Sequence, residues 1–338
     1  MEAGKSSVKY LSSSSRNPMS QFKITGYGLY LPPTVETAEE LAPKINKTPQ
    51  WIISRAGVKE RRVSQIDVDE MGALAIKEAV GNKQIPDLII NASGVPRQVI
   101  PDTSVFMQLQ LGYSGIPSFS VHATCLSFII ALNIAGNFIS SGQYKRIVIV
   151  SSDRGTRGRN FNEPESAALL GDAAAAIYIE PTNSNSGLLD YSMETYPEGA
   201  TLTEVRGGGT HLHPQDPKTK ESDNLFSMNG PLIFKMALDK VYIRINKDLE
   251  ANNLLQSDIK LLIPHQASGK GVRAYSRFGG FKKEQVMDIV ETTGNCVAAS
   301  VPLALVMAQK QKLFKEGDLI YLVGTGAGLS IASALIKV

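Results

Sequence analysis

The chain has 338 residues, of which 43% are hydrophobic and 20% are charged, and 35 Lys and Arg against 32 Asp and Glu give a formal net charge of +3. This profile is typical of a globular protein with a large core, and a prior of about 150 residues per domain predicts about two domains. The small charge argues against a nucleic-acid partner, and the lack of an apolar run of about 18 residues argues against a membrane span.

The cysteine content and the N-terminal segment bear on the cellular compartment in which the protein is expected. The two cysteines, Cys125 and Cys296, are too few for a disulfide-stapled secreted fold, which favours the cytoplasm. Residues 1–18 are rich in serine but lack the apolar segment of a secretory signal. We expect them to be a disordered extension, with a weak transit peptide as the alternative, and exclude them from the fold.

The predicted elements from residue 19 onward alternate between strand and helix. They are strand 22–30, helix 71–80, strand 87–91, helix 103–111, strand 118–122, helix 126–139 and strand 146–151. This alternation predicts α/β layering. Helix 126–139 is apolar on nearly every face, so we expect it to lie in the centre of the protein with sheets on both sides.

The second half of the chain repeats this order. The polar segment 187–227 is interpreted as the connection between the halves. It is followed by helix 232–249, strand 259–263, a further helix, apolar helix 297–310, and strands 319–323 and 330–336. The similar spacing predicts an internal duplication into the halves 19–185 and 186–338, with chemistry at the carboxyl ends of their strands.

Cys125 stands between strand 118–122 and the first apolar helix. A helix N-terminus presents free N–H groups and a partial positive charge, which favour a thiolate and predict a lowered thiol pKa. The position therefore suits a nucleophile. The alternative is that Cys125 is one more small buried residue.

His265 follows the apolar strand 259–263 and Pro264, where side chains face a crevice. A nucleophilic thiol needs a base or a hydrogen-bond donor, and a neutral imidazole supplies either; the alternative is an ordinary hydrogen-bonded histidine. Of the other histidines, His122 is predicted inside a strand, while His211 and His213 lie in the connection without further metal ligands. We therefore expect no metal site.

Asn295 precedes the second apolar helix much as Cys125 precedes the first, and taken alone it would be an N-cap. If the two halves face each other, Cys125 and Asn295 occupy pseudo-symmetric positions with His265 between them. An amide and an imidazole can both donate to a carbonyl or enolate oxygen as it gains negative charge. Together the three residues indicate a catalytic site.

The sequence resembles the β-ketoacyl-acyl-carrier-protein synthase III family of the thiolase superfamily over nearly the whole span 19–338. The motifs that carry the resemblance are Trp51 to Arg61, the Cys125 segment, Gly171 to Ala176, Pro264 to Ala267, Gly294 to Pro302 and Gly324 to Leu329. The resemblance implies a thiolase-like five-layered αβαβα fold with two pseudo-symmetric halves, and a homodimer.

In this family a Cys, a His and an Asn form the catalytic triad, and these roles fall on Cys125, His265 and Asn295. The resemblance implies that Cys125 takes an acyl group from a coenzyme A thioester, and that a malonyl thioester then loses carbon dioxide and condenses with it. The backbone N–H groups of Cys125 and Ala327 would form the oxyanion hole. No metal or other cofactor is implied beyond the coenzyme A thioesters that serve as substrates.

Four more residues are carried over as contacts for coenzyme A or an acyl carrier protein. Trp51 and Arg157 match positions that stack on the adenine, a geometry suited to an indole and a guanidinium plane. Arg55 and Lys270 are candidates for phosphate contacts or for docking an acidic carrier protein, with plain surface charge as the alternative.

Departures from the family concern the primer, which is the acyl group loaded first. Leu126 and Ser127 replace a common Ala-Gly pair, Ala327 replaces a glycine, and Ile100 replaces an aromatic residue of the pocket-gating segment. Ile100 and Leu126 are therefore the candidate primer-pocket residues. The sequence predicts a synthase III-like enzyme of fatty acid or specialised acyl or polyketide biosynthesis. The alternatives are an acyltransferase or non-decarboxylative condensing enzyme of the same fold, and a catalytically silent acyl-binding partner subunit.

Overall fold

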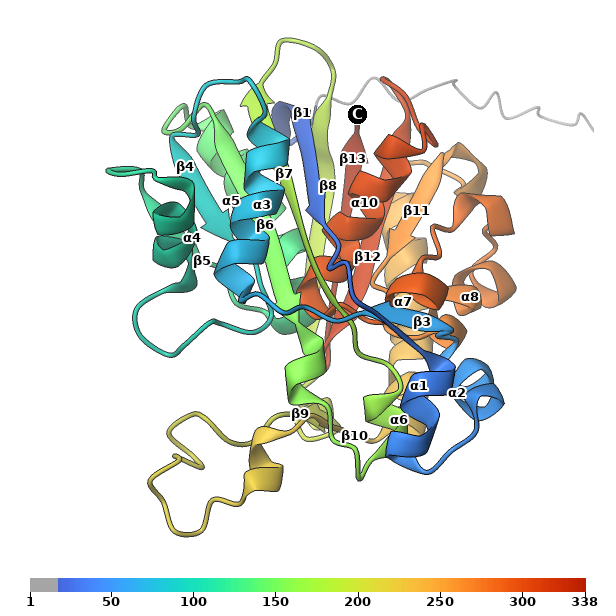
Figure 1. The fold of residues 1–338 in the computed structure, drawn as a ribbon. Helices are drawn as coiled ribbons and strands as arrows, with labels where there is room; N and C mark the ends of the chain where they lie inside the picture. The colour runs from blue at the N-terminus through green and yellow to red at the C-terminus, as the bar shows by residue number, and fades with distance from the viewer. Residues whose placement is uncertain (1–17) are drawn as a thin grey trace, which may run out of the picture.

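The computed structural model describes residues 18–338, so the predicted extension 1–18 lies outside the described residues except for Pro18. Nine strands form one continuous sheet in the order β11-β12-β13-β8-β1-β7-β6-β4-β5 (Figure 1). The sheet has two portions, which are joined where the start of β1 pairs with the start of β8 through Ser20 and Gln21.

The first portion consists of β1 (Ser20–Tyr30), β4 (Leu88–Asn91), β5 (Ser118–Ser120), β6 (Ile147–Arg154) and β7 (Asp172–Pro181). β4 is parallel to β5 and β6, and β7 is antiparallel to β1 and β6. Helices α3 (Val68–Val80) and α4 (Thr103–Leu111) cover its outer face. There the apolar side of α3 packs on β4, β6 and β7 because its hydrophobic residues recur at helical spacing.

The second portion consists of β8 (Gly187–Thr195), β11 (Leu261–Pro264), β12 (Leu319–Gly326) and β13 (Ser330–Lys337). β11 is parallel to β12, and β13 is antiparallel to β12 and β8. Helices α7 (Gly230–Ala251) and α8 (Gly269–Phe278) cover its outer face. The buried carboxylate of Asp248 accepts hydrogen bonds from Tyr321 and Ser333, both at 2.6 Å, which ties the C-terminal half of α7 to the strands.

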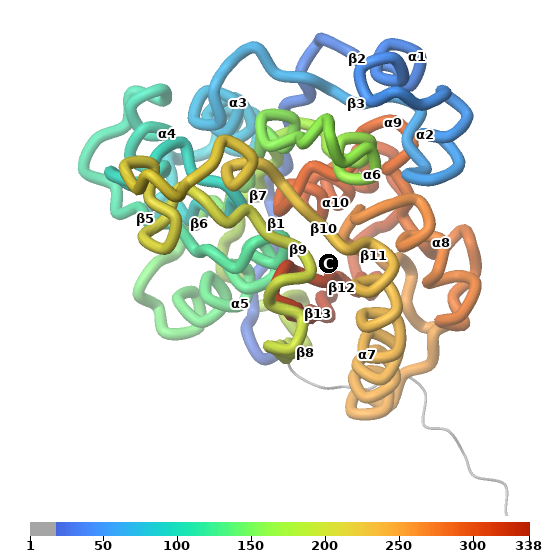
Figure 2. The backbone as a smooth tube through the Cα atoms, turned by 90° about the horizontal axis from the view of Figure 1, so that it is seen from below, coloured from blue at the N-terminus to red at the C-terminus, as the bar shows by residue number. Residues whose placement is uncertain are grey.

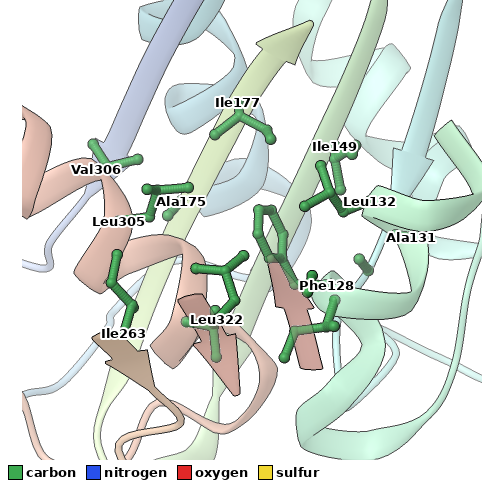
Figure 3. Packing of buried hydrophobic residues seen from close by; sticks show 14 of the residues in the cluster. Phe128, Ala131, Leu132, Ile149, Ala175, Ile177, Ile263, Leu305, Val306 and Leu322 are labelled. Carbon is green, nitrogen blue, oxygen red and sulfur yellow. The ribbon is translucent and has the colours of Figure 1, made fainter. Parts of the chain in front are cut away.

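The central layer is formed by α5 (Ser127–Ser140) and α10 (Ser300–Lys310), which contact both portions of the sheet. Figure 3 shows Phe128 of α5 among side chains of α10 and of strands from both portions. Phe128, Leu305 and Leu322 are fully buried there. The expected central position of helix 126–139 and the five-layered thiolase-like architecture are thus confirmed.

Shorter elements lie at the lower end of the molecule in Figure 1, and Figure 2 shows them from below. They are α1 (Ala38–Leu41), α2 (Pro49–Ala56), α6 (Pro164–Ala167), α9 (Val290–Thr293), the pair β2 (Val35–Thr37) and β3 (Glu60–Arg62), and the pair β9 (Thr203–Glu204) and β10 (Ser227–Met228).

The structure corrects the interpretation of 187–227 as a plain connection. Its first part is β8, which pairs with β13 along most of its length and joins the two portions of the sheet. Asp190, Ser192 and Glu194 alternate with other residues along β8, so the two-residue period of a strand was present but hidden by the polar composition. The division of the chain between 185 and 186 stays a prediction. Within residues 18–338 no helix has the length and apolar character to span a membrane.

Candidate active site

Cys125 lies in a single 3₁₀ turn, Thr124–Leu126, immediately before α5. Thr124 has a left-handed φ of 51°, which is unusual for a β-branched residue. The buried Ser127 hydroxyl accepts a hydrogen bond from the Ala123 N–H at 3.0 Å and donates to the Thr124 carbonyl at 2.7 Å. These bonds hold the turn that presents Cys125.

The second central helix begins in the same way. This similarity shows that the predicted pseudo-symmetric pairing of Cys125 with Asn295 is wrong. Val297 also has a φ of 51°, and Ser300 accepts from the Cys296 N–H at 3.0 Å as Ser127 accepts from Ala123. When the two helix starts are aligned on these two features, Cys125 corresponds to Ala298. Asn295 therefore corresponds to His122 and not to Cys125, because it lies before the turn and Cys125 lies within it.

The glycine-rich end of β12 packs directly on the Cys125 turn. A Cβ added at Gly326 would lie 2.7 Å from the Thr124 Oγ1, and one added at Gly324 would lie 3.0 Å from the His265 Cβ and 3.1 Å from the Leu126 Cδ2. The absence of a side chain at these two positions lets the turn, the His265 loop and β12 approach one another.

The pKa of the Cys125 thiol is raised to about 12, mainly by burial and to a smaller extent by the negative charge of Asp153. The backbone N–H groups of Cys125 and Ala327 face the sulfur and act in the opposite direction. The predicted lowering of this pKa by the helix start is therefore wrong, because desolvation in the half-buried site outweighs the two N–H groups. In the free protein Cys125 is therefore a neutral thiol, and the backbone N–H groups of Cys125 and Ala327 face its sulfur.

His265 follows β11, and its backbone N–H donates to the Val323 carbonyl of β12 at 2.8 Å. The side chain is 5% exposed, and its Nδ1 is buried without a hydrogen-bond partner among residues 18–338. Desolvation lowers the pKa of the imidazole to about 4. His265 is therefore neutral near pH 7, and it has one N–H to donate.

Asn295 reaches the same site from the start of the second central helix. Gly294, with a φ of 65°, packs its Cα against Leu169, and the Asn295 N–H donates to the Leu169 carbonyl at 2.8 Å. The side-chain Oδ1 accepts from the Val297 N–H at 2.9 Å, which orients the Nδ2 toward the His265 loop, where it lies 3.4 Å from the Ala267 carbonyl. Asn295 is not itself the N-cap, which is Cys296, but its side chain holds the helix start through Oδ1 and presents Nδ2 as a donor.

An apolar cleft of about 150 Å³ has His265 and Thr325 among its lining residues. Its walls come from α7, including Ile233, Phe234 and Leu238, and from α8. The N-terminal half of α7 is only partly buried, so these side chains face the cleft. A long, mainly apolar substrate arm can reach His265 along this route.

The predicted coenzyme A and carrier-protein residues lie on several elements near this cleft. Arg55 of α2 forms a close ion pair with Glu165, at 2.6 Å. Trp51 of α2 is half-buried, with the Lys47 ammonium 5.3 Å from its ring centre. Lys270, between the cleft residues Ser268 and Gly271, and Arg157 are exposed. Their ligand roles stay predictions.

The two predicted primer-pocket residues differ sharply in exposure. Leu126 is fully buried beside His265, whereas Ile100 is 80% exposed.

His122, predicted inside a strand, is exposed just beyond β5, because the strand ends at Ser120. His213 accepts from the Gln215 N–H, and the part of the chain that the structure describes contains no group of three or more side chains able to hold a metal.

Sequence reasoning missed the cleft walls of α7 and the buried Asp153. The helix 232–249 was recognised, but nothing in its pattern distinguishes an apolar face that lines a cleft from one that lines a core. Asp153 did carry a signal, since it stands near the carboxyl end of an apolar strand, where charged residues are expected near a site.

Comparisons with known proteins agree on one group of relatives. Residues 249–338 match the family model described as 3-Oxoacyl-[acyl-carrier-protein (ACP)] synthase III C terminal, and residues 119–197 match the one described as 3-Oxoacyl-[acyl-carrier-protein (ACP)] synthase III. The chain is 30% identical over 323 residues to the beta-ketoacyl-[acyl-carrier-protein] synthase III of Rickettsia bellii, an overlap of 93% of this chain and 99% of the relative.

Solved structures extend the similarity to the fold. The 3-oxoacyl-[acyl-carrier-protein] synthase III of Aquifex aeolicus superposes with a TM-score of 0.85 at 30% identity, covering 94% of this chain and 100% of the other. The priming beta-ketosynthase of the R1128 polyketide pathway superposes with a TM-score of 0.86 at 24% identity, covering 96% and 98%, and shows the same fold.

The buried, neutral His265 makes folding depend on pH. Its folded pKa of about 4 lies below the unfolded value of about 6.5, so between these values the unfolded chain binds the additional proton and stability falls as the pH is lowered. We predict that between pH 7 and 4.5 the wild type loses about 2 kcal/mol more unfolding free energy than His265→Asn, measured by urea denaturation. Equal losses in the two proteins would show that the folded imidazole is not held neutral.

Proposed function

The chain belongs to the 3-oxoacyl-[acyl-carrier-protein] synthase III family, and from this we propose that it loads an acyl group from coenzyme A onto Cys125 and condenses it with a malonyl thioester. Its function is of the synthase III type, an acyltransferase reaction. One observation carries the assignment of the site: two backbone N–H groups face a cysteine sulfur on a turn that packs against Gly324 and Gly326, and the neutral histidine that also packs on Gly324 lines an apolar cleft.

In the first half-reaction the Cys125 sulfur attacks the carbonyl carbon of the acyl-coenzyme A thioester. The carbonyl oxygen becomes negative in the tetrahedral intermediate, and the N–H groups of Cys125 and Ala327 stabilise it. Collapse of the intermediate breaks the bond to the coenzyme A sulfur. The thiol proton of Cys125 ends on that sulfur, so acyl-Cys125 and free coenzyme A are the products.

In the second half-reaction a malonyl thioester occupies the cleft, and its carboxylate leaves as carbon dioxide. The electron pair remains as an enolate, whose oxygen takes hydrogen bonds from the His265 N–H and the Asn295 Nδ2. A neutral imidazole and an amide suit this role, because both donate without bringing a positive charge that would hold the carboxylate. The enolate carbon then attacks acyl-Cys125, and the Cys125 sulfur leaves and is reprotonated.

The substrate arm and its carrier are assigned from the cleft and the charges around it. The apolar walls of α7 and α8 suit a pantetheine arm, whether on coenzyme A or on a carrier protein. Arg55 and Lys270 stand close to the cleft, and either can pair with phosphate or with an acidic carrier. Trp51 and Arg157 supply planar groups for an adenine.

An exposed apolar patch supports a homodimer. Val99, Ile100 and Leu109 are 79%, 80% and 72% exposed, and they lie near β5, the edge strand of the sheet. Large apolar residues gathered at a sheet edge are typical of a protein interface. In a dimer, Ile100 would act at the site of the other copy, since in its own chain it is exposed at the surface while Leu126 is fully buried.

The acylated residue is tested by labelling. Cys125→Ala should abolish the mass increase that intact-mass analysis detects after incubation with acyl-coenzyme A, because no nucleophile remains. Cys296→Ala is the matched control, since Cys296 is fully buried before the second central helix. Normal labelling of Cys125→Ala together with loss in Cys296→Ala would reverse the assignment.

The two half-reactions are expected to separate in the other triad variants. His265→Ala and Asn295→Ala should still become acylated on Cys125, but their malonyl decarboxylation should fall at least about a hundredfold, or roughly 2.7 kcal/mol, the scale of a lost oxyanion donor. Carbon dioxide release from the malonyl thioester is the measurement. Wild-type release in Asn295→Ala would remove Asn295 from the mechanism.

The primer preference follows from pocket shape. Ile100 in place of an aromatic removes ring volume and Leu126 adds bulk, and each methylene in an apolar pocket is worth about 1–3 kcal/mol. We expect a medium-length or other non-acetyl acyl-coenzyme A to load faster than acetyl-coenzyme A, measured as loading rates over two- to twelve-carbon chains. Ile100→Phe should move the preference back toward acetyl. A clear wild-type maximum at acetyl would contradict this expectation.

The oligomeric state is checked by sedimentation equilibrium. The wild type should have twice the mass of the 36.5 kDa chain, and Leu109→Asp should shift it toward monomer because a charge in an apolar interface loses its solvation. Leu255→Asp is the control, since Leu255 is 62% exposed outside the patch. A monomeric wild type, or an equal shift in both variants, would contradict the dimer.

A further inference from the structure

Arg55, one of the predicted phosphate contacts, already binds a carboxylate of the protein. Its Nε and its Nη2 both donate to the Glu165 Oε1, at 2.8 and 2.6 Å. The two side chains come from α2 and α6, which lie side by side at the lower end of the molecule (Figures 1 and 2). Two of the nitrogens that could bind a phosphate are thus occupied by Glu165.

The second oxygen of Glu165 lies beside the apolar cleft. No hydrogen bond among residues 18–338 uses this Oε2, which is 3.6 Å from the position that a Cβ of Gly230 would occupy. Gly230 is the first residue of α7, and it lines the cleft together with Met228. A carboxylate bound to Arg55 therefore stands where the cleft meets the start of α7.

A second contact joins the segment of Glu165 to this part of the cleft. The Ser227 hydroxyl, one residue before Met228, donates to the Glu163 carboxylate at 2.9 Å. The segment around α6 is therefore bonded to α2 on one side and to β10, which carries Met228, on the other. A substrate arm that enters the cleft beside β10 passes the pair of Arg55 and Glu165.

This ion pair can be exchanged for another at low cost. The side chains of Arg55 and Glu165 are 46% and 39% exposed. Exposed ion pairs contribute little to stability, because water and salt screen the attraction. A phosphate forms charge-assisted, bidentate bonds with a guanidinium, so it can displace Glu165. The affinity that the phosphate gains is reduced by the pair that it breaks and by its repulsion from the carboxylate.

We propose that Glu165 is a specificity-determining residue, which competes with substrate phosphate for Arg55 and so lowers the affinity for the nucleotide portion of coenzyme A. The uncharged pantetheine arm is not affected. This inference rests on the proposed function, because it takes Arg55 as a phosphate contact. In the reaction, Glu165 binds Arg55 again as coenzyme A leaves, which helps to clear the cleft for the malonyl thioester.

The test measures coenzyme A binding by isothermal titration calorimetry to full-length protein carrying Cys125→Ala, in which the site has no thiol that could react with the ligand. Glu165→Gln keeps the size of the side chain and removes its charge. The Kd for coenzyme A should therefore fall about fivefold, which corresponds to about 1 kcal/mol. Binding of pantetheine, which has no phosphate, should not change.

Glu163→Gln is the matched control. It removes the same charge two residues away, and the Glu163 carboxylate is bonded to Ser227 and not to Arg55. It should change the Kd for coenzyme A by less than about twofold, because exposed charges without direct contact are screened. A double-mutant cycle tests the route of the effect: in an Arg55→Met background, Glu165→Gln should no longer strengthen binding.

Three results would overturn the inference and leave the proposed function intact. They are an unchanged Kd in Glu165→Gln, an equal gain in Glu163→Gln or with pantetheine, and a gain that persists in the Arg55→Met background. A lack of measurable coenzyme A binding in all of these proteins would instead contradict the proposed function together with the inference. The two failures are therefore distinguishable.

Discussion

The close approach of two helix starts to the glycine-rich end of β12 is the constraint on which the site depends. At Gly326 a side chain would collide with Thr124, and at Gly94 it would collide with Val297. The backbone N–H groups of Cys125 and Ala327 face the Cys125 sulfur. Such donors are fixed by the fold and need no reorganisation when an oxygen becomes negative. The five layers provide the rigidity, because both central helices are buried between the two portions of the sheet (Figure 3).

Burial also sets the protonation of the site. Desolvation moves the pKa of Cys125 up and that of His265 down, so the thiol and the imidazole are both neutral in the free protein. A thiolate–imidazolium ion pair at this place would have to form without the stabilisation that water gives to charged groups. The neutral pair instead leaves the hydrogen-bond donors unoccupied until substrate oxygens arrive.

Much of this architecture could be predicted from hydrophobic patterning and motifs. The helix at Thr103–Leu111 and the central position of α5 followed from helical periodicity and from an apolar character on every face. Cys125, His265 and Asn295 became candidates because each stands at the end of a strand or the start of a buried helix, and their catalytic roles stay predictions. The strand β8 and the pKa of Cys125 were mispredicted. Both depend on three-dimensional neighbours, namely the pairing of β8 with β13 and the desolvation of the sulfur, which local sequence does not encode.

The central claim is that the acyl group on Cys125 places its carbonyl oxygen between the N–H groups of Cys125 and Ala327. Isotope-edited infrared spectroscopy of the acyl-enzyme, loaded with acyl-coenzyme A carrying ¹³C at the carbonyl, measures this directly. Two hydrogen bonds to the oxygen weaken the carbonyl bond, so its stretching band should lie at lower frequency than that of the same thioester in an apolar solvent. A band at the frequency of a thioester in an apolar solvent would contradict the account, because it would show that no donor reaches the oxygen.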